Sequence, residues 1–176
     1  TIALYPEVEN IEVIEIEREV LKNKVLFDDY NGYVSKNAKV HFNEMDAFRF
    51  LEGSNKKFDI VISEPSNPWV AGVENLYSRE FYQTAKSKMS SDGLFVQWIH
   101  TYSFTNDLLR MVLKTMSTQF AHLSVFTLRG GDLAVLGTNV PVDRGDLKRG
   151  EKRYRDNPIL AKSLQDGGVE RYETIW

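Results

Sequence analysis

Carboxylates stand at three points of the sequence where a strand is expected to end. Glu15 closes a β-branched segment, Asp46 follows a second one, and Glu64 comes directly after the run FDIVIS. A carboxylate at such a position can accept hydrogen bonds from the two hydroxyls of a ribose. A carboxylate at the rim of an apolar crevice has a raised proton affinity and can serve as a general base. These three acids are the candidate working groups.

Each of the three acids also has a purely structural interpretation. Glu15 is also compatible with a solvated surface glutamate. Asp46 suits a contact to the amine of an adenine, but it is also compatible with an ordinary helix N-cap. Pro65 holds Glu64 in an extended conformation, yet the loop SEPSNPW is also compatible with a rigid segment whose Trp69 covers the core. The residues alone leave these alternatives open.

Histidines offer a second kind of proton carrier. His100 and Tyr102 follow the segment LFVQWI, at the same expected edge as Glu64. An imidazole can carry a proton near neutral pH, although a lone histidine is more often structural. His41 and His122 are scattered elsewhere, so the histidines show no metal-ligand spacing and we expect no metal site.

Composition excludes several classes of protein. The chain has 176 residues and no cysteine, which rules out a disulfide scaffold, a thiol nucleophile and a cysteine-ligated metal. The formal net charge of −3 argues against a dedicated nucleic-acid binder. No apolar run approaches the roughly 18 residues of a membrane span, and no signal peptide opens the chain. A soluble globular domain remains.

The elements expected to position these residues alternate between strands and helices. We expect strands over 11–16, 38–42, 58–63, 94–99, 123–128 and 133–137, and helices over 17–24, 46–51, 78–89, 105–116 and 157–165. Such alternation predicts an α/β fold with a mostly parallel, doubly wound, Rossmann-like sheet, closed by an antiparallel C-terminal hairpin. Ligands bind beyond the carboxyl ends of such strands.

Two divisions of the chain follow from this pattern. Residues 1–140 are expected to form a nucleotide-binding domain and residues 141–176 a helical, polar extension of it. The segment 58–63 is expected to be a buried strand, and Asp92-Gly93 a turn before the next one. The basic stretch from Arg144 to Arg155 is expected to be a solvated face.

In order along the chain, these segments resemble the spermidine synthase family on the class I S-adenosylmethionine-dependent methyltransferase fold. The matching text is IEVIEIERE (11–19), HFNEMDAFRFL (41–51), FDIVISEPSNPWVAGVENLYSREFY (58–82), DGLFVQWIH (92–100) and GDLAVLG (131–137). The resemblance covers roughly residues 1–140 and is most specific in the SEPSNPW loop. It is closest to spermidine synthase-like domains fused to membrane transporter segments.

The resemblance implies an activity and a donor site. Family members transfer an aminopropyl group from decarboxylated S-adenosylmethionine to a polyamine such as putrescine, leaving methylthioadenosine. Position by position, it implies that Glu15 binds the donor's ribose and that Asp46, with Ala47, reads its adenine. Glu64 falls at the catalytic aspartate, and Pro65 begins the loop, up to residue 77, that closes over donor and amine.

The same resemblance implies an amine site. Asn67 stands where a second aspartate binds the diamine, and Gln97 matches a glutamine that lines the substrate pocket. Trp69, His100 and Tyr102, at the same expected edge, are expected to line that pocket too. The partner is therefore a small-molecule amine, with no nucleic acid and no membrane contact by this segment. Members of the family often form homodimers, so the resemblance is compatible with a homodimer here.

Three departures from the family pattern qualify this expectation. Glu64 is one methylene longer than aspartate, and the neutral Asn67 removes one of two anchors for a dication, which makes putrescine a doubtful acceptor. The family's first strand and glycine-rich turn find no counterpart, because no G-x-G-x-x-G pattern occurs. We therefore expect the chain to be a fragment that binds the donor weakly or not at all by itself.

Three functions stay open at this point. The first is an aminopropyltransferase-like domain, the second a methyltransferase that uses S-adenosylmethionine itself, and the third a non-catalytic nucleotide-binding or regulatory module. The asparagine at position 67 favours the third over the first. A cytoplasmic location is expected, either free or as the soluble domain of a membrane-bound parent protein.

Overall fold

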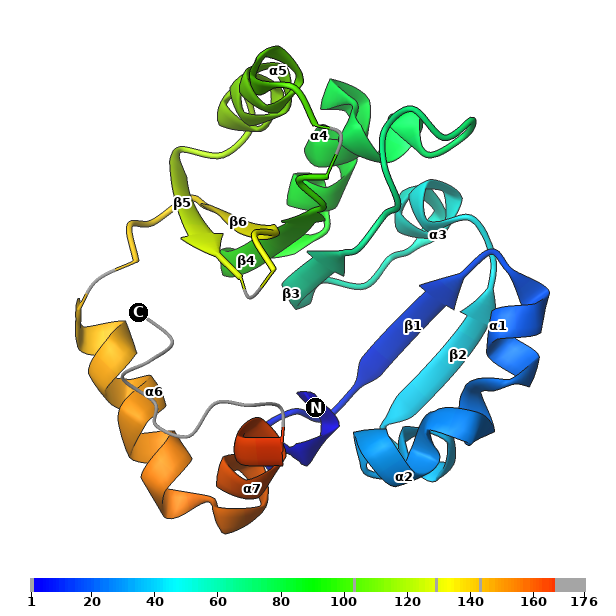
Figure 1. The fold of residues 1–176 in the computed structure, drawn as a ribbon, viewed down its shortest axis with the longest axis vertical. Helices are drawn as coiled ribbons and strands as arrows, with labels where there is room; N and C mark the ends of the chain where they lie inside the picture. The colour runs from blue at the N-terminus through cyan, green and yellow to red at the C-terminus, as the bar shows by residue number, and fades with distance from the viewer. Residues whose placement is uncertain (1, 103, 129, 143, 167–176) are drawn as a thin grey trace. The chain divides into compact units, whose positions relative to one another are not determined.

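The computed structural model describes residues 2–102, 104–128, 130–142 and 144–166, and the side chains of 144–147 are outside this description. The chain divides into two compact units, Thr1–Phe50 with Asp143–Trp176 and Leu51–Val142 (Figure 1). Each unit has its own sheet, and each is described separately. The predicted division at residue 140 stays a prediction.

The first unit is built on two parallel strands. Strand β1 (Ile11–Glu15) pairs with β2 (Val40–Glu44), and the register sets Glu15 opposite Glu44. Helix α1 (Arg18–Lys22) follows β1 and contacts both strands. The connection to β2 runs through three short helical pieces: η2 (Lys24–Phe27), α2 (Asp28–Asn31) and η3 (Val34–Lys36).

The same unit contains the two ends of the described chain. A 3₁₀ turn, η1 (Ile2–Leu4), precedes β1, while α6 (Arg144–Asp156) and α7 (Pro158–Asp166) follow the second unit in sequence. Asn157 caps α7, because its Oδ1 accepts from the Leu160 N–H at 3.0 Å. Among the described residues, no helix combines the length and the hydrophobicity that crossing a bilayer would need.

The second unit contains a four-stranded sheet in the order β3-β4-β6-β5. Strand β3 (Phe58–Ser63) runs parallel to β4 (Met89–Ile99), while β6 (Leu133–Thr138) is antiparallel to β4 and to β5 (His122–Thr127). Helix α3 (Ala47–Gly53) precedes β3, the turn η4 (Glu74–Tyr77) leads into α4 (Arg79–Ser87), and α5 (Asn106–Ser117) lies between β4 and β5.

An aromatic core lies between one face of this sheet and helices α4 and α5. Phe95 points to this face from β4, is fully buried, and stacks on Phe120 with ring centroids 5.1 Å apart. Tyr82 from α4 meets Phe95 edge-on at 5.6 Å, and Phe81 meets it at 6.3 Å. Gln97 and Ile99 share the Phe95 face because alternate strand residues point the same way.

The α/β class predicted from the sequence is confirmed, as is the antiparallel hairpin of β5 and β6. Two of the helices expected from the sequence begin at the expected residues, Ser78 and Thr105, whose side chains act as N-caps. Ser78 Oγ accepts from the Phe81 N–H at 3.1 Å, and Thr105 Oγ1 accepts from the Leu108 N–H at 3.2 Å.

Two local predictions are wrong. Asp92-Gly93 is no turn but part of β4, where the register with β3 shifts between Phe58 and Ile60. Strand β3 is not buried throughout, because Ile60 and Ile62 are 49% and 44% exposed. These two side chains alternate with Val61 and Ser63, so they point away from the face that α4 and α5 cover. Helix α6 was not anticipated as a helix.

Candidate functional site

Glu15 lies at the carboxyl end of β1, as predicted. Its Oε1 accepts a hydrogen bond of 2.7 Å from the Glu17 N–H, and its backbone carbonyl accepts from the Met45 N–H at 3.1 Å. The second bond holds the residue after β2 against the end of β1. Asp46, which is the next residue in the chain, therefore lies at the same end of the two strands as Glu15. The ribose-binding role of Glu15 stays a prediction.

Asp46 caps helix α3 with one of its carboxylate oxygens. Its Oδ1 accepts from the Arg49 N–H at 2.9 Å, and the half-buried Ala47 begins the helix. The structural interpretation of this aspartate as an N-cap is therefore correct. A role toward adenine would use the other oxygen, and that role stays a prediction.

The loop after β3 is anchored to the second unit by two buried side chains and one hydrogen bond. Pro65 and Asn67 are buried, while Glu64 and Ser66 are exposed. The Tyr77 hydroxyl donates to the Ser66 carbonyl at 2.9 Å, and burial raises the pKa of Tyr77 to about 12. Because that hydroxyl keeps its proton at neutral pH, the bond fixes the two ends of the loop together.

Asn67 and Tyr102 meet across the ends of β3 and β4. The Asn67 Nδ2 donates to the Tyr102 hydroxyl at 2.7 Å, although the two residues are 35 positions apart. Asn67 is only 4% exposed, and its Oδ1 has no hydrogen-bond donor among the described residues. Trp69, which is half exposed, packs on Phe104 with ring centroids 5.6 Å apart.

Gln97 supplies a second buried amide oxygen. The residue is fully buried, and it is the register partner of Ser63, the last residue of β3. Its Nε2 donates to the Trp98 carbonyl at 3.4 Å, while Oε1 has no donor within the described part of the chain. A buried amide oxygen without a donor is unfavourable. Among the described residues these two amide oxygens, together with the Tyr82 hydroxyl, are the buried side-chain polar atoms without a hydrogen-bond partner.

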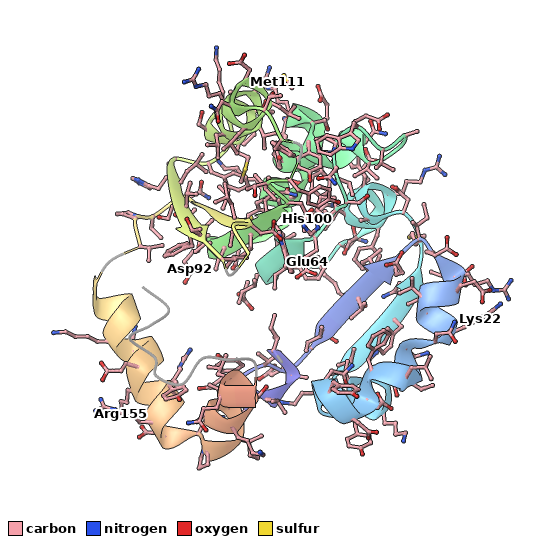
Figure 2. All side chains as sticks on the ribbon, viewed as in Figure 1. Lys22, Glu64, Asp92, His100, Met111 and Arg155 are labelled. Atoms are coloured by element: carbon pink, nitrogen blue, oxygen red, sulfur yellow. The ribbon has the colours of Figure 1, made fainter. Side chains whose placement is uncertain are left out.

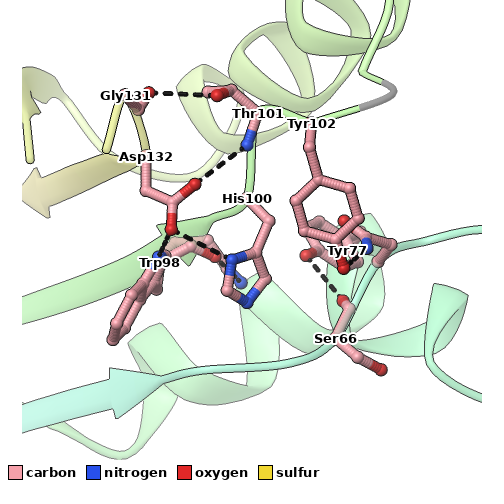
Figure 3. Close-up of polar contacts among 10 residues, drawn as sticks. Ser66, Tyr77, Trp98, His100, Thr101, Tyr102, Gly131 and Asp132 are labelled. Carbon is pink, nitrogen blue, oxygen red and sulfur yellow. Dashed lines mark hydrogen bonds and ion pairs between the residues drawn. The ribbon is translucent and has the colours of Figure 1, made fainter. Parts of the chain in front are cut away.

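Asp132 organises the end of β4, and sequence reasoning missed it. Its carboxylate accepts from Trp98 Nε1 at 3.1 Å, from His100 Nδ1 at 3.0 Å and from the Thr101 N–H at 3.2 Å (Figure 3). The register of β6 on β4 causes this meeting, since Leu133 lies opposite Ile99. The sequence predicted the antiparallel hairpin of β5 and β6 but not the pairing of β6 with β4 that brings Asp132 to His100.

The position of His100 agrees with the sequence-based expectation. Its ring stands 5.6 Å from that of Tyr102 and 5.4 Å from that of Trp98, and its side chain is one third exposed. Figure 2 marks His100 and Glu64, which follow the parallel strands β4 and β3. Glu64 is exposed and has no hydrogen-bond or ion-pair partner among the described residues.

The predicted site residues thus form two groups. Glu15, Asp46 and Ala47 lie at the end of β1 and β2 in the first unit. The second unit contains the amine-side set: Glu64, Pro65, Asn67, Trp69, Gln97, His100 and Tyr102. No group of three or more histidine or acidic side chains that could hold a metal ion occurs in the described segments.

A family model places this chain among known proteins. The model for the spermine/spermidine synthase domain matches residues 1–129. The chain belongs to the spermine/spermidine synthase family. The matched segment contains every predicted site residue and ends three residues before Asp132.

Similar proteins named polyamine aminopropyltransferases are consistent with this family membership. A polyamine aminopropyltransferase of Buchnera aphidicola is 25% identical over 88% of this chain and 57% of its own length. Polyamine aminopropyltransferase 2 of Aquifex aeolicus is 31% identical over 80% of this chain and 30% of its own. This spermine/spermidine synthase family member therefore spans little more than half of the Buchnera enzyme.

Solved structures share this fold and confirm the predicted Rossmann-like, methyltransferase type. A spermidine synthase in complex with the transition state analogue AdoDATO has a TM-score of 0.72 at 14% identity, over 88% of this chain and 54% of its own. The spermidine synthase of Thermotoga maritima has a TM-score of 0.69 at 14% identity, over 88% and 52%. Human methyltransferase-like protein 13, in complex with SAH, reaches 0.64 at 15%, over 89% and 71%.

Proposed function

We propose that the protein transfers an aminopropyl group from decarboxylated S-adenosylmethionine to a small amine. The observation that supports this most strongly is the pair of buried, donorless oxygens, Asn67 Oδ1 and Gln97 Oε1, at the ends of β3 and β4. Hydrogen bonds from an ammonium or amine would satisfy both. Membership of the spermine/spermidine synthase family supplies the reaction class.

The donor side of the proposal uses the first unit. Glu15 and Asp46 each have one carboxylate oxygen committed to a backbone N–H, from Glu17 and Arg49. The second oxygen of each carboxylate is proposed to bind the adenosyl part of the donor, Glu15 at the ribose and Asp46 with Ala47 at the adenine. The predicted donor contacts of Glu64 and Pro65, which follow β3 in the second unit, stay a prediction.

The acceptor side uses the second unit. Glu64 is proposed as the catalytic carboxylate, which attracts the protonated amine and promotes loss of its proton. The aromatic rings of Trp69 and Tyr102 suit the aliphatic part of an amine and its cationic end. Because Asn67 is neutral, this site attracts a second positive charge less strongly than a carboxylate would. The proposed acceptor is therefore an amine whose single cationic group is the reacting one, attracted by Glu64, with no second positive charge at the Asn67 side.

A kinetic comparison tests the proposal. The full-length protein is mixed with decarboxylated S-adenosylmethionine and a panel of mono- and diamines, and methylthioadenosine is measured. We expect transfer, and we expect Glu64→Gln to lower kcat/KM by about 10²-fold or more, the usual contribution of acid–base groups. Glu80→Gln, an exposed acid in the first turn of α4, is the matched control and should retain full activity.

Two results would contradict the proposal. The first is absence of methylthioadenosine with every amine although the donor binds. The second is equal activity of the Glu64→Gln and Glu80→Gln variants, which would remove Glu64 from the reaction.

A further inference from the structure

Asp132 holds His100 in one orientation, and the function proposed above makes no use of this contact. The carboxylate receives three hydrogen bonds at once, from Trp98 Nε1, His100 Nδ1 and the Thr101 N–H, at 3.0–3.2 Å. Desolvation acts to raise the pKa of Asp132, but the bonds from Thr101, Trp98 and His100 outweigh it and lower that pKa. The group is therefore a carboxylate at neutral pH.

An ionised carboxylate opposite Nδ1 fixes the tautomer of the imidazole. A carboxylate can only accept, so the Nδ1 of His100 must carry the hydrogen of their 3.0 Å bond. The neutral ring then has its lone pair on Nε2, for which the described residues offer no hydrogen-bond partner. When Nε2 takes up a proton, the new positive charge faces the negative charge of Asp132.

The surroundings of this ring are those of the proposed amine site. His100 is one third exposed, its ring neighbours that of Tyr102, and the Tyr102 hydroxyl is bonded to Asn67. The titratable groups near it are Asp132 from the turn before β6, Tyr102 on its own segment, and Glu64 after the neighbouring parallel strand. No other histidine lies among the residues that form this edge.

An imidazole suits the required proton transfer better than a carboxylate does. Alkylammonium groups have pKa values of about 10, carboxylic acids about 4 and imidazoles about 6.5 in water. Proton transfer is most effective when the acceptor stays deprotonated at working pH and still binds protons well, which favours the imidazole. We propose that His100, held by Asp132, accepts the proton of the amine that Glu64 attracts. This rests on the aminopropyl transfer proposed above.

Charge and electrons are conserved in the proposed proton transfer and the aminopropyl transfer that follows it. The neutral Nε2 of His100 takes one proton from the ammonium, which leaves a free amine with its lone pair and an imidazolium facing Asp132. The amine nitrogen forms a bond to the carbon next to the donor's sulfonium. The carbon–sulfur bond breaks, its electron pair goes to sulfur, and a neutral thioether and a secondary ammonium result. His100 then releases its proton to water.

The test compares two histidine variants of the full-length protein. His100→Asn is expected to lower kcat by about 10²-fold, the usual contribution of a proton acceptor, with donor affinity unchanged. The wild type is expected to show an inflection in the pH profile of kcat, and this variant is expected to lose it. His122→Asn is the matched control, because His122 is an exposed residue of the edge strand β5. It should keep both the rate and the profile.

A second measurement separates the positioning role of Asp132 from a structural one. Nitrogen NMR of the histidine-labelled protein should show His100 with its hydrogen on Nδ1. In Asp132→Asn the side-chain amide can donate to Nδ1 and favour the other tautomer. We expect this variant to lose kcat and alter the pH profile, while Asp132→Glu recovers part of both. A thermal-stability change alone, with an unaltered profile, would overturn the positioning role.

The two proposals fail in different ways. If His100→Asn keeps the wild-type rate and pH profile while Glu64→Gln is inactive, aminopropyl transfer stands and the histidine proposal is wrong. If NMR shows the hydrogen on Nε2 in the wild type, the histidine proposal is also wrong. If the wild type transfers no aminopropyl group to any amine, the proposed function fails and the base proposal fails with it.

Discussion

The bond between Asn67 and Tyr102 predicts an unusual sensitivity at an exposed residue. Tyr102 is 63% exposed, and substitutions at such positions normally change stability by about 0.5 kcal/mol or less. Its hydroxyl, however, is the acceptor for the Asn67 Nδ2 at 2.7 Å, and Asn67 is only 4% exposed. Tyr102→Phe therefore leaves a buried amide without its partner.

The size of the effect follows from that burial. An unsatisfied buried donor costs about 1–3 kcal/mol, so we expect Tyr102→Phe to lower the free energy of unfolding by about that amount. For a chain of this size the loss corresponds to about 2–4 °C in Tm per kcal/mol. In an Asn67→Leu background the same change should be nearly neutral, because both partners are then apolar.

The assay is urea denaturation of the four proteins of this double-mutant cycle, followed by tryptophan fluorescence. Two of the three tryptophans, Trp69 and Trp98, lie in the unit Leu51–Val142, so a Trp176→Phe background confines the signal to the unit that contains the bond. Tyr30→Phe is the control, since Tyr30 is 89% exposed and should change stability little. Equal effects of Tyr102→Phe and Tyr30→Phe, or additive effects in the cycle, would refute the reasoning.

Two further predictions concern the same unit. A Cβ on Gly137 would lie 2.6 Å from Phe120 Cγ, so Gly137→Ala should destabilise by about 1–3 kcal/mol in urea. Gly53→Ala, at the end of α3 with open space around it, should be neutral or stabilising; a similar loss in both variants would contradict the packing argument. The lowered pKa of Asp132 adds stability that is present above about pH 3.8 and is lost as pH falls through the folded-state pKa. The stability difference between wild type and Asp132→Asn should therefore shrink in acid, and a difference that grows there would be inconsistent with this sign.

Local sequence signals predicted local structure well. Helix starts at Ser78 and Thr105 could be predicted because a hydroxyl beside an amphipathic stripe satisfies backbone N–H groups only a few residues away. The hairpin of β5 and β6 followed from its glycine-rich turn. The strand β3 was located correctly too, and the proline after it marked the start of the loop.

Contacts that depend on which strands pair in the sheet could not be predicted from such local signals. Asp132 meets His100 because β6 pairs with β4, 30 residues or more away in sequence, and no periodicity encodes that partner. The partial exposure of β3 was missed for a related reason, since the run FDIVIS is mostly apolar, whereas Ile60 and Ile62 on one of its faces are 49% and 44% exposed. Helix α6 was not predicted because charged residues dominate its sequence and leave no apolar stripe at helical spacing.

The central claim is that this spermine/spermidine synthase family member transfers an aminopropyl group. The most direct test is the identity of the adenosyl product when the full-length protein is given an amine and either decarboxylated or ordinary S-adenosylmethionine. We predict methylthioadenosine in equal amount to aminopropylated amine, from the decarboxylated donor. Formation of S-adenosylhomocysteine from the ordinary donor would instead establish methyl transfer, and failure to bind any adenosyl ligand would leave only a non-catalytic module.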